Sequence, residues 1–517
     1  MQEALTPNID KDLLARFNEE IWNKTPHPSQ SGHIVNPTPL VDITDALSEC
    51  ARVEYRLSLP TETARVFAKF DSQIFGGSVK VRPAVEILGN AIRTGKLRTG
   101  QTIFEATSGN FGLALGMARK LGIEVIALVS RKLQGGVLDE LKGEGVRSIN
   151  LDVDICPAPG LKVDQNMVMA KAAASNLREQ LSQTGLDVRT FDRARSQAEQ
   201  LLAKQDIINL AKLLARIYDG FCPEQYDNEL NVKSHETVTA VEINDQLRAL
   251  GHSMDQFEIL TAFGTGGTST GIAKYVQTKY RRKSVHVVFP LFNQEVAGIR
   301  TKDKAAGLMF YQPDLYAGEH EVDFESAKRL LKFFASRGYG IGESGALALY
   351  SCLQMINYGA GNKFVVIIAD GPQKYMTKLE VPTKIPDRLE TTLEEVTSNA
   401  SSYDQVIWTH AMFVPREAGI DLVASTLGCD KTKVKVAKTQ DVQALITREE
   451  IPAGIGELLP KDRSRTLLVC MVGGTSLRAA EILTKKGVVA QSLTGGIMNL
   501  AELSNRSADE MVQVASE

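Results

Sequence analysis

The chain has 517 residues, of which 43% are apolar and 23% charged, a composition typical of a soluble globular protein with about three domains. Its 59 basic and 62 acidic residues give a net charge of −3, which offers no electrostatic footprint for nucleic acid. The six cysteines are scattered and form no C-x-x-C pair, so neither a disulfide framework nor a zinc site is expected.

The first 35 residues are expected to form an extension with one helix, from Lys11 to Trp22, which Pro26 and Pro28 end. This segment carries acidic residues and lacks the apolar region of a secretory signal. No apolar run approaches the roughly 18 residues that a membrane span needs. We therefore expect a cytoplasmic protein with no membrane partner.

From residue 36 onward, short β-rich runs alternate with helical patterns, which indicates a parallel α/β fold. The clearest predicted strands are residues 102–105, 124–129, 257–262, 285–290 and 364–368. The stretch 160–220 breaks this rhythm, because its apolar residues recur at helical spacing and predict two or three added helices. Simple packing on the domain is their expected role, although a cap over a site or a subunit contact would fit the same pattern.

The first α/β block is expected to span residues 36–385, because the proline-containing segment 381–387 ends its pattern. A smaller α/β domain is expected at 400–517. Its clearest part is residues 467–500, where an apolar run, a glycine-containing loop and a helical pattern follow one another.

Lys80 lies in the small-residue turn Phe-Gly-Gly-Ser-Val-Lys at 75–80, directly before an apolar helical run. A lysine in such a place can act as a reactive amine rather than as a surface charge. Two further segments follow a predicted strand and precede a helical pattern. They are Glu-Ala-Thr-Ser-Gly-Asn-Phe-Gly at 105–112 and Gly-Thr-Gly-Gly-Thr at 264–268.

The glycine-rich segment is a candidate phosphate cradle. Glycines let successive backbone N–H groups turn inward, and the N-terminus of the following helix favours an anion. The segment does not match G-x-G-x-x-G, so a nicotinamide cofactor is disfavoured. The residues expected to hold the phosphate are Gly264, Thr265, Gly266, Gly267 and Thr268.

In this order the three motifs resemble those of the β-family (fold type II) pyridoxal-phosphate enzymes, which include cysteine synthase, cystathionine β-synthase and cysteine desulfhydrases. The resemblance covers roughly residues 35–380. It implies a tryptophan-synthase-β-like, two-lobed parallel α/β fold, pyridoxal 5'-phosphate as cofactor, and a homodimer. Lys80 would bond the cofactor and move the substrate α-proton. One departure is Val81, where the family commonly has Asp, although Arg82 is kept.

The resemblance also assigns the segment that follows the strand at 102–105. Asn110 would hydrogen-bond the ring oxygen of the cofactor, and Thr107, Ser108 and Gly109 would hold the substrate carboxylate. An ordinary helix N-cap would explain the same residue types, because Ser and Asn satisfy the free N–H groups at a helix start.

The pyridine nitrogen of the cofactor faces a Ser or Thr in the family, and here the position falls on Glu343 or the neighbouring Ser344. A hydroxyl can leave that nitrogen neutral, which suits β-elimination. A carboxylate would keep it protonated, because an opposite charge commonly shifts a pKa by about 1–3 units. Both residues remain candidates.

In the smaller domain, Cys470 begins the loop Cys-Met-Val-Gly-Gly-Thr-Ser before a helical pattern. Backbone N–H groups at a helix N-terminus stabilise an anionic sulfur. The loop resembles the active-site loop of rhodanese, in which the cysteine carries a persulfide, and residues 493–497 resemble that domain's closing Gly-Gly stretch. The usual Asp-x-Arg and Gly-His-Ile-Pro-like segments are missing from 400–455. An inert, buried Cys470 in a degenerate interaction module is the alternative.

Together these resemblances predict β-elimination from a β-substituted L-amino acid such as cysteine or cystine, with release of sulfur, pyruvate and ammonia. Sulfur would pass to Cys470 or to an acceptor protein. Cysteine synthase-like β-replacement is the first alternative, and a non-catalytic sulfur-carrier or sensor scaffold is the second. No metal is expected, because the seven histidines occur singly.

Overall fold

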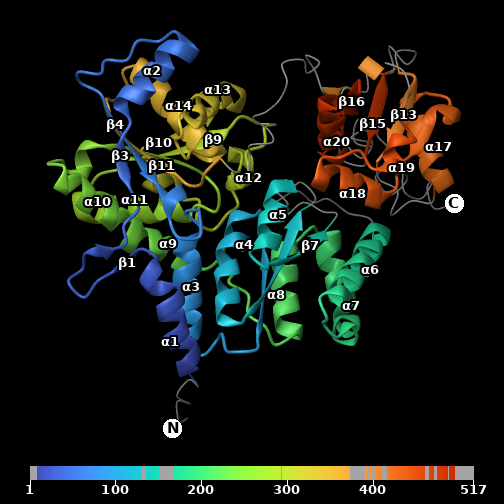
Figure 1. Cartoon of the computed structure of the whole chain (residues 1–517), viewed down its shortest axis with the longest axis horizontal. Coiled ribbons are helices and arrows are strands. Elements are labelled where there is room, and N and C mark those ends of the chain that lie inside the picture. Colours follow the sequence, from blue (N-terminus) through green and yellow to red (C-terminus); the bar gives the residue numbers. More distant parts are fainter. Residues whose placement is uncertain are drawn as a thin grey trace.

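The computed structural model describes residues 9–130, 135–151, 167–292, 294–372, 390–392, 395–396, 403–409, 416–459, 465–470, 474–486 and 488–494. Three α/β units are visible in Figure 1, each with helices on a parallel or mostly parallel sheet. Among the described residues, no helix is both long and apolar enough to cross a bilayer.

A six-stranded sheet forms the centre of the first lobe, with strand order β10-β9-β8-β11-β4-β3. Its strands are parallel except β3, which pairs antiparallel with β4 at the edge. The strand bounds are β3 Leu40–Asp42, β4 Arg65–Phe70, β8 Glu258–Ala262, β9 Val285–Pro290, β10 Gly318–Val322 and β11 Lys363–Ile368.

Helices cover both faces of this sheet, so the central strand β11 is apolar from Phe364 to Ile368. In β11, Phe364, Val366 and Ile368 pack on one side, and Val365 and Ile367 pack on the other. The first side carries α2 Thr44–Tyr55, α13 Phe324–Ser336 and α14 Glu343–Asn357. The second carries α10 Ala240–Ala249 and α11 Gly267–Tyr280.

The second lobe is built on a three-stranded parallel sheet, in the order β5-β6-β7. Its strands are β5 Thr102–Ala106, β6 Glu124–Ser130 and β7 Arg147–Leu151. One face packs against α1 Lys11–Glu20, α3 Val81–Arg93, α4 Asn110–Leu115 and α5 Gly135–Gly143. The other packs against α6 Met167–Gln183, α7 Val188–Ala203 and α8 Ile207–Ile217. The stretch expected to add helices at 160–220 therefore completes this layered lobe instead of standing over a site.

The third unit lies between residues 390 and 494 and has a five-stranded parallel sheet, in the order β12-β16-β15-β13-β14. The strands are β12 Glu390–Thr391, β13 Gln405–Trp408, β14 Val434–Val436, β15 Thr466–Val469 and β16 Ala490–Leu493. Helix α17 Arg416–Leu427 covers one face, and α18 Thr439–Arg448 and α20 Gly474–Lys485 cover the other. Helix α18 also contacts α5 of the second lobe, as Figure 1 shows.

The remaining short elements are β1 His27–Pro28, β2 Ile34–Val35, α9 Leu230–Ser234, α12 Lys302–Ala305 and α19 Ala453–Gly456. All five runs predicted as strands are strands, with ends that differ by at most one residue. The first helix ends at Glu20, two residues before the expected Trp22, because the chain tightens into a 3-10 turn from Trp22 to Lys24.

Candidate active site

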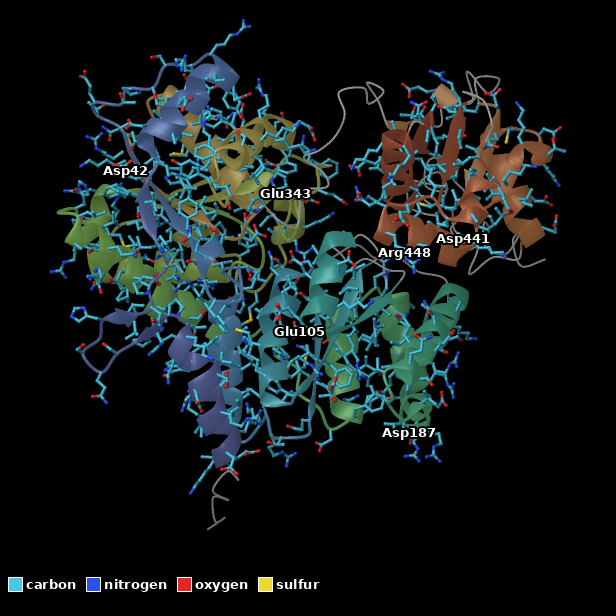
Figure 2. The ribbon with its side chains drawn as sticks, in the orientation of Figure 1. Asp42, Glu105, Asp187, Glu343, Asp441 and Arg448 are labelled. Carbon is cyan, nitrogen blue, oxygen red and sulfur yellow. The ribbon has the colours of Figure 1, made fainter. Side chains whose placement is uncertain are left out.

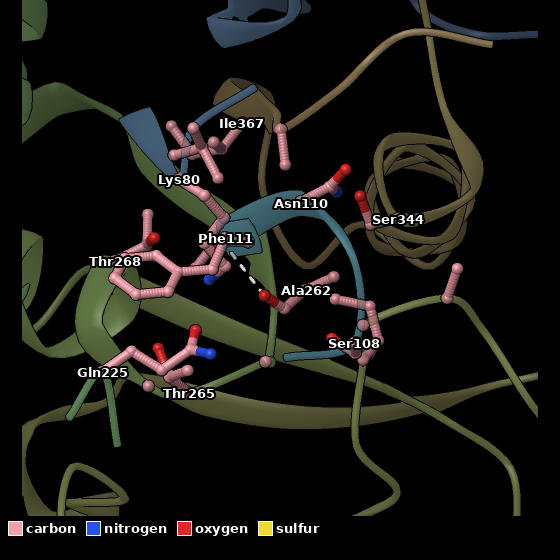
Figure 3. A pocket seen from close by; sticks show the side chains of 18 of the residues that line it. Lys80, Ser108, Asn110, Phe111, Gln225, Ala262, Thr265, Thr268, Ser344 and Ile367 are labelled. Atoms are coloured by element: carbon pink, nitrogen blue, oxygen red, sulfur yellow. Dashed lines mark hydrogen bonds between the residues drawn. The ribbon is translucent and has the colours of Figure 1, made fainter. Parts of the chain in front are cut away.

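A cavity lies where loops from both lobes meet at the carboxyl ends of β5, β8 and β11. It opens to solvent, and its water-accessible volume is about 50 Å³. Several predicted site residues line it: Lys80, Ser108, Asn110, Gly264, Thr265, Gly266, Thr268 and Ser344. Figure 3 shows most of these side chains around one space, although they come from segments up to 264 positions apart in the chain.

Lys80 is placed by a glycine turn immediately before α3. Gly76 and Gly77 have φ angles of 97° and 79°, which residues with a Cβ rarely adopt. A Cβ on Gly76 would lie 2.7 Å from Cγ2 of Val81. The buried Val81, which stands where the family commonly has Asp, therefore packs against this turn.

The amine of Lys80 faces the glycine-rich loop: its Nζ lies 3.7 Å from the position that a Cβ on Gly264 would take. Burial lowers the pKa of Lys80 to about 8, against an attractive contribution from Asp370, and Arg300 lowers it further. A much larger share of Lys80 is thus a neutral, nucleophilic amine near neutral pH than of a solvated lysine.

Arg82 finds its carboxylate partners outside the turn. Its guanidinium donates to both oxygens of Asp71, at 2.9 and 2.7 Å, and to Oε2 of Glu242 at 2.8 Å. Lys69 pairs with the other oxygen of Glu242, and all four side chains are buried. Two cations thus balance two anions, which a buried network requires. The network ties the start of α3, and with it Lys80, to the first lobe.

The glycine-rich loop has the shape of an anion cradle. Gly266 is the N-cap of α11 and has a φ of 90°. A Cβ there would lie 2.7 Å from the carbonyl oxygen of Phe310, and one on Gly264 would lie 2.8 Å from that of Gly298. Only glycine fits at these positions, so backbone N–H groups border the cavity at the start of a 14-residue helix. A phosphate group fits this donor set.

The segment 107–110 forms the opposite wall. The hydroxyl oxygen of Thr107 accepts from the backbone N–H groups of Gly109 and Gly112, each at 3.1 Å, and so caps α4. Gly109 has a φ of 124° and Ser108 opens onto the cavity. Thr107, two residues before the N-cap Gly109, therefore satisfies an N–H group of α4 in place of Ser108 or Asn110, and Ser108 lines the cavity.

Asn110 lies beside the segment that follows β11 and carries Asp370. Its Nδ2 donates to Oδ2 of Asp370 at 2.7 Å, which orients the amide at the cavity wall. Asp370 follows β11 and is bridged to Ser78 of the lysine turn. These contacts join the end of β11, the lysine turn and the start of α4 around one space.

Glu343 and Ser344 point to different neighbours, although they are adjacent. Ser344 lines the cavity. Glu343, labelled in Figure 2, is buried, and its Oε2 accepts from the backbone N–H of Ala297 at 3.1 Å. Of the two candidates for the pyridine nitrogen, Ser344 therefore has the better position, and Glu343 holds the loop at 297.

Gln225, which no motif in the sequence indicated, also lines the cavity. Its Nε2 donates to the carbonyl oxygen of Ala106 at 2.9 Å, and its N–H and that of Glu224 donate to the carboxylate of Glu105. Burial raises the pKa of Glu105 to about 8. Two other missed residues, Asn231 and His235, lie behind the glycine-rich loop. Their i, i+4 spacing in the sequence could have indicated them, since it places both side chains on one face of a helix.

Cys470 lies at the carboxyl end of β15, the central strand of the third unit. The hydroxyl of Ser476 donates to its sulfur at 3.3 Å, and Oγ of Ser476 lies 2.9 Å from that of Ser492. All three residues are fully buried. The predicted loop residues 471–473 and the Gly-Gly stretch at 495–496 lie outside the described residues, so the likeness to rhodanese remains a prediction.

The cavity suits pyridoxal phosphate in three respects. It offers a buried amine with a lowered pKa, a cradle that a Cβ would fill, and a hydroxyl at the far wall. Among the described residues, no group of three or more His, Cys, Asp or Glu side chains is placed to hold a metal ion.

Comparison with known proteins agrees with this chemistry. A cysteine synthase from Staphylococcus aureus is 24% identical over 348 residues, which are 66% of this chain and 96% of that protein. An O-acetylserine dependent cystathionine beta-synthase from Bacillus subtilis is 24% identical over 351 residues, 66% of this chain and 97% of its own.

Two solved structures are similar to about two thirds of the chain. One is O-ureido-L-serine synthase, with a TM-score of 0.48 and 22% identity over 68% of this chain and 95% of its own. The other is a hydrogen sulfide-producing enzyme from Fusobacterium nucleatum, with a TM-score of 0.47 and 19% identity over 65% and 96%.

A family model described as pyridoxal-phosphate dependent enzyme matches residues 35–371, which is more than half of the chain and includes every cavity residue named above. The match stops before the third unit, so it does not extend to Cys470. By this match and the cavity that it covers, the chain belongs to the pyridoxal-phosphate dependent enzyme family.

Proposed function

We propose that this enzyme eliminates the β-substituent of an L-amino acid, in the manner of a cysteine or cystine desulfhydrase, and releases sulfur, pyruvate and ammonia. The observation that carries the proposal is the convergence of an amine with a pKa of about 8, an anion cradle and a hydroxyl-bearing wall on one cavity. The similar cysteine synthase and cystathionine beta-synthase support a small sulfur-related amino acid as substrate.

Pyridoxal phosphate supplies an aldehyde that bonds amines and a ring that delocalises the electron pair left at Cα. Lys80 would hold the cofactor through its Nζ. The same amine would accept the α-proton of the substrate, a role that requires a neutral amine, and could return this proton later. With a pKa of about 8, a larger share of Lys80 is neutral near neutral pH than of a solvated lysine.

The other cavity residues would bind and orient. The loop from Gly264 to Thr268 would hold the phosphate, and Asn110 the ring oxygen. Ser108, which lines the cavity, would hold the substrate carboxylate, and Thr107 and Gly109 would shape its loop, because the hydroxyl of Thr107 accepts from the backbone N–H of Gly109. Ser344 would donate to or accept from the pyridine nitrogen, since it lines the cavity and Glu343 is engaged by Ala297.

Product analysis tests the proposal. We expect purified enzyme to form pyruvate from L-cysteine or L-cystine in the absence of a second substrate, with ammonia in equal amount. Absence of pyruvate from every β-substituted amino acid tried, with the cofactor still bound, would refute elimination and leave β-replacement or a sensor or carrier scaffold.

β-Replacement is the second candidate, because the curated relatives named above are synthases. Elimination and replacement share the removal of the α-proton and differ in whether a nucleophile then adds. Incubation with O-acetyl-L-serine and sulfide separates them. Cysteine formed faster than pyruvate would establish replacement as the main reaction.

We further propose that the third unit is rhodanese-like and accepts sulfur at Cys470, directly or on behalf of an acceptor protein. Support comes from the position of Cys470 at the carboxyl end of a central parallel strand, the usual place for a site in such sheets. Elimination from cystine releases cysteine persulfide, whose outer sulfur can move to a thiol and leave cysteine, with no oxidant needed. Elimination from cysteine releases hydrosulfide, which is too reduced for this transfer.

Mass spectrometry of Cys470 after separate incubation with cystine and cysteine tests the transfer. We expect persulfide with cystine alone. Persulfide formed equally from both substrates, or from neither, would refute the coupling of Cys470 to elimination. If neither substrate forms it, Cys470 is an inert core residue, which its full burial would also explain. A homodimer is proposed from family resemblance and is tested by light scattering of the purified enzyme.

A further inference from the structure

A short helical segment, residues 230–239, is packed directly behind the glycine-rich loop. It consists of α9 and a π-helical turn, His235–Thr239. A Cβ on Gly267 would lie 2.0 Å from Oδ1 of Asn231, and one on Gly271 would lie 2.6 Å from Cβ of His235. The two glycines of α11 therefore permit this approach, and no other residue would fit.

Two side chains of this segment reach the two threonine hydroxyls of the loop. Nδ2 of Asn231 donates to Oγ1 of Thr265 at 3.1 Å. One turn later, Nε2 of His235 lies 3.2 Å from Oγ1 of Thr268, which lines the cavity. The other ring nitrogen, Nδ1, lies 2.9 Å from Oγ1 of Thr239. His235 is thus bonded on both sides and fully buried.

Burial lowers the pKa of His235 to about 3, and the charges of Arg82 and Lys80 lower it further, against a smaller opposing effect of Asp71. The imidazole is therefore neutral at physiological pH, and one of its nitrogens donates while the other accepts. The position of the ring hydrogen, on Nε2 or on Nδ1, decides whether the hydroxyl of Thr268 can donate a hydrogen bond into the cavity.

We propose that His235 is a positioning residue for the phosphate cradle: Nε2–H donates to Oγ1 of Thr268 and leaves the hydroxyl hydrogen of Thr268 free to point at an anion. In this tautomer, Nδ1 accepts from the hydroxyl of Thr239, 2.9 Å away. In the opposite tautomer, Nε2 would take the hydroxyl hydrogen, and Thr268 would present only lone pairs to the phosphate. The proposal rests on the use of residues 264–268 as the phosphate cradle and adds the group that orients its last hydroxyl.

Two amide variants separate the two ring nitrogens. The side-chain nitrogen of His235→Gln can take the place of Nε2, whereas that of His235→Asn can take only the place of Nδ1. We expect His235→Gln to bind pyridoxal phosphate within about threefold of the parent and His235→Asn to bind it about tenfold more weakly, the cost of one buried hydrogen bond left unmade. The 31P resonance of the bound cofactor should move in His235→Asn and stay in place in His235→Gln. His33→Gln, at a side chain that is 82% exposed, is the control and should bind like the parent.

A double-mutant cycle with Thr268→Val checks that the effect passes through this hydroxyl. Adding His235→Asn to Thr268→Val should cause no further loss of affinity, because the shared contact is already gone. Equal affinity of His235→Gln and His235→Asn, or additive losses in the cycle, would overturn the proposal. Circular dichroism and thermal unfolding of the cofactor-free variants identify a general folding defect, which the Gln and Asn variants would share.

Cofactor affinity and the 31P resonance of the bound cofactor can both be measured without turnover. Failure of β-elimination with the affinity pattern intact would refute the proposed reaction alone. Failure of the affinity pattern in an active enzyme would refute the role of His235 alone.

Discussion

The surroundings of Lys80 and those of Cys470 both lie at the carboxyl ends of parallel strands, yet they differ in what converges there. Around Lys80, loops from two lobes bring an amine of lowered pKa, an anion cradle and a buried ion network. Around Cys470, the hydroxyl of Ser476 donates to the sulfur and lies beside the hydroxyl of Ser492, and all three residues are buried. The end of a parallel sheet supplies a place for a site, but chemistry needs charged and polar groups that converge on it.

Replacement of Lys80 by Ala should have the largest effect on the first region. Loss of the group that holds the cofactor and moves the α-proton should lower turnover by about 10³-fold or more. Borohydride reduction should then fix no cofactor to the chain, as peptide mapping would show. The exposed Lys171→Ala is the matched control and should keep both properties. Labelling of another lysine in the parent would contradict the assignment.

The pH dependence of cofactor loading should follow the pKa of Lys80. Burial lowers this pKa to about 8, and only the neutral amine attacks an aldehyde, so loading should become faster as pH rises and level off above the pKa. Between about pH 6 and about pH 8 the neutral fraction, and hence the rate, should rise about 50-fold. Stopped-flow absorbance of cofactor-free enzyme mixed with pyridoxal phosphate measures it. A rate that still climbs steeply above about pH 9, as for a lysine with an ordinary pKa, would show that Lys80 is not desolvated.

Gly267→Ala should weaken cofactor binding, because it disturbs the segment packed behind the glycine-rich loop. Its Cβ would lie 2.0 Å from Oδ1 of Asn231 and would push the segment behind the loop away. Overpacking of this kind costs about 1–3 kcal/mol, so cofactor affinity should fall about tenfold. Gly143→Ala, where a Cβ would meet nothing within 4 Å, is the control. Equal affinity of the two variants would mean that the loop does not depend on this contact.

Ser344→Ala and Glu343→Gln should differ in their effect on the visible spectrum of the bound cofactor. Loss of the Ser344 hydroxyl should lower kcat several-fold and alter the visible spectrum of the bound cofactor, because this hydroxyl lines the cavity. Glu343→Gln keeps an oxygen for the N–H of Ala297, so its spectrum should stay unchanged. A spectrum that shifts in Glu343→Gln alone would place the carboxylate at the pyridine nitrogen after all.

Cys470→Ser should have the smallest effect on pyruvate formation. Its sulfur lies in the third unit, outside the cavity and outside the part of the chain that the family model matches, so the steady-state rate should stay within about twofold. Loss of turnover in this variant would break the contrast between the two regions and would mean that sulfur acceptance is part of the main reaction.

The strands and the placement of the main motifs could be predicted because local patterns determine them. A strand buried on both faces, such as β11, reads as a continuous apolar run. The loops that carry Asn110 and Gly264 directly follow such runs, so their meeting at one sheet edge follows from parallel topology.

The supporting contacts could not be predicted, because they join residues far apart in the chain. Arg82 meets Glu242 across 160 positions, and no local pattern names that partner. The choice between Glu343 and Ser344 stayed open for a different reason. Adjacent residues in a helix point about 100° apart, so only the packing of α14 decides which of them faces the cavity.

Helix α5 gives the cavity and the third unit a common boundary. Its Val137 lines the cavity, and the same helix contacts α18 beyond it. By thermodynamic linkage, any preference of a bound ligand for one packing of α5 acts on the α18 contact with equal free energy, and the reverse holds as well. If a bound ligand has such a preference, the melting temperature of the third unit would change with cavity occupancy, whether or not sulfur is transferred between the cavity and Cys470.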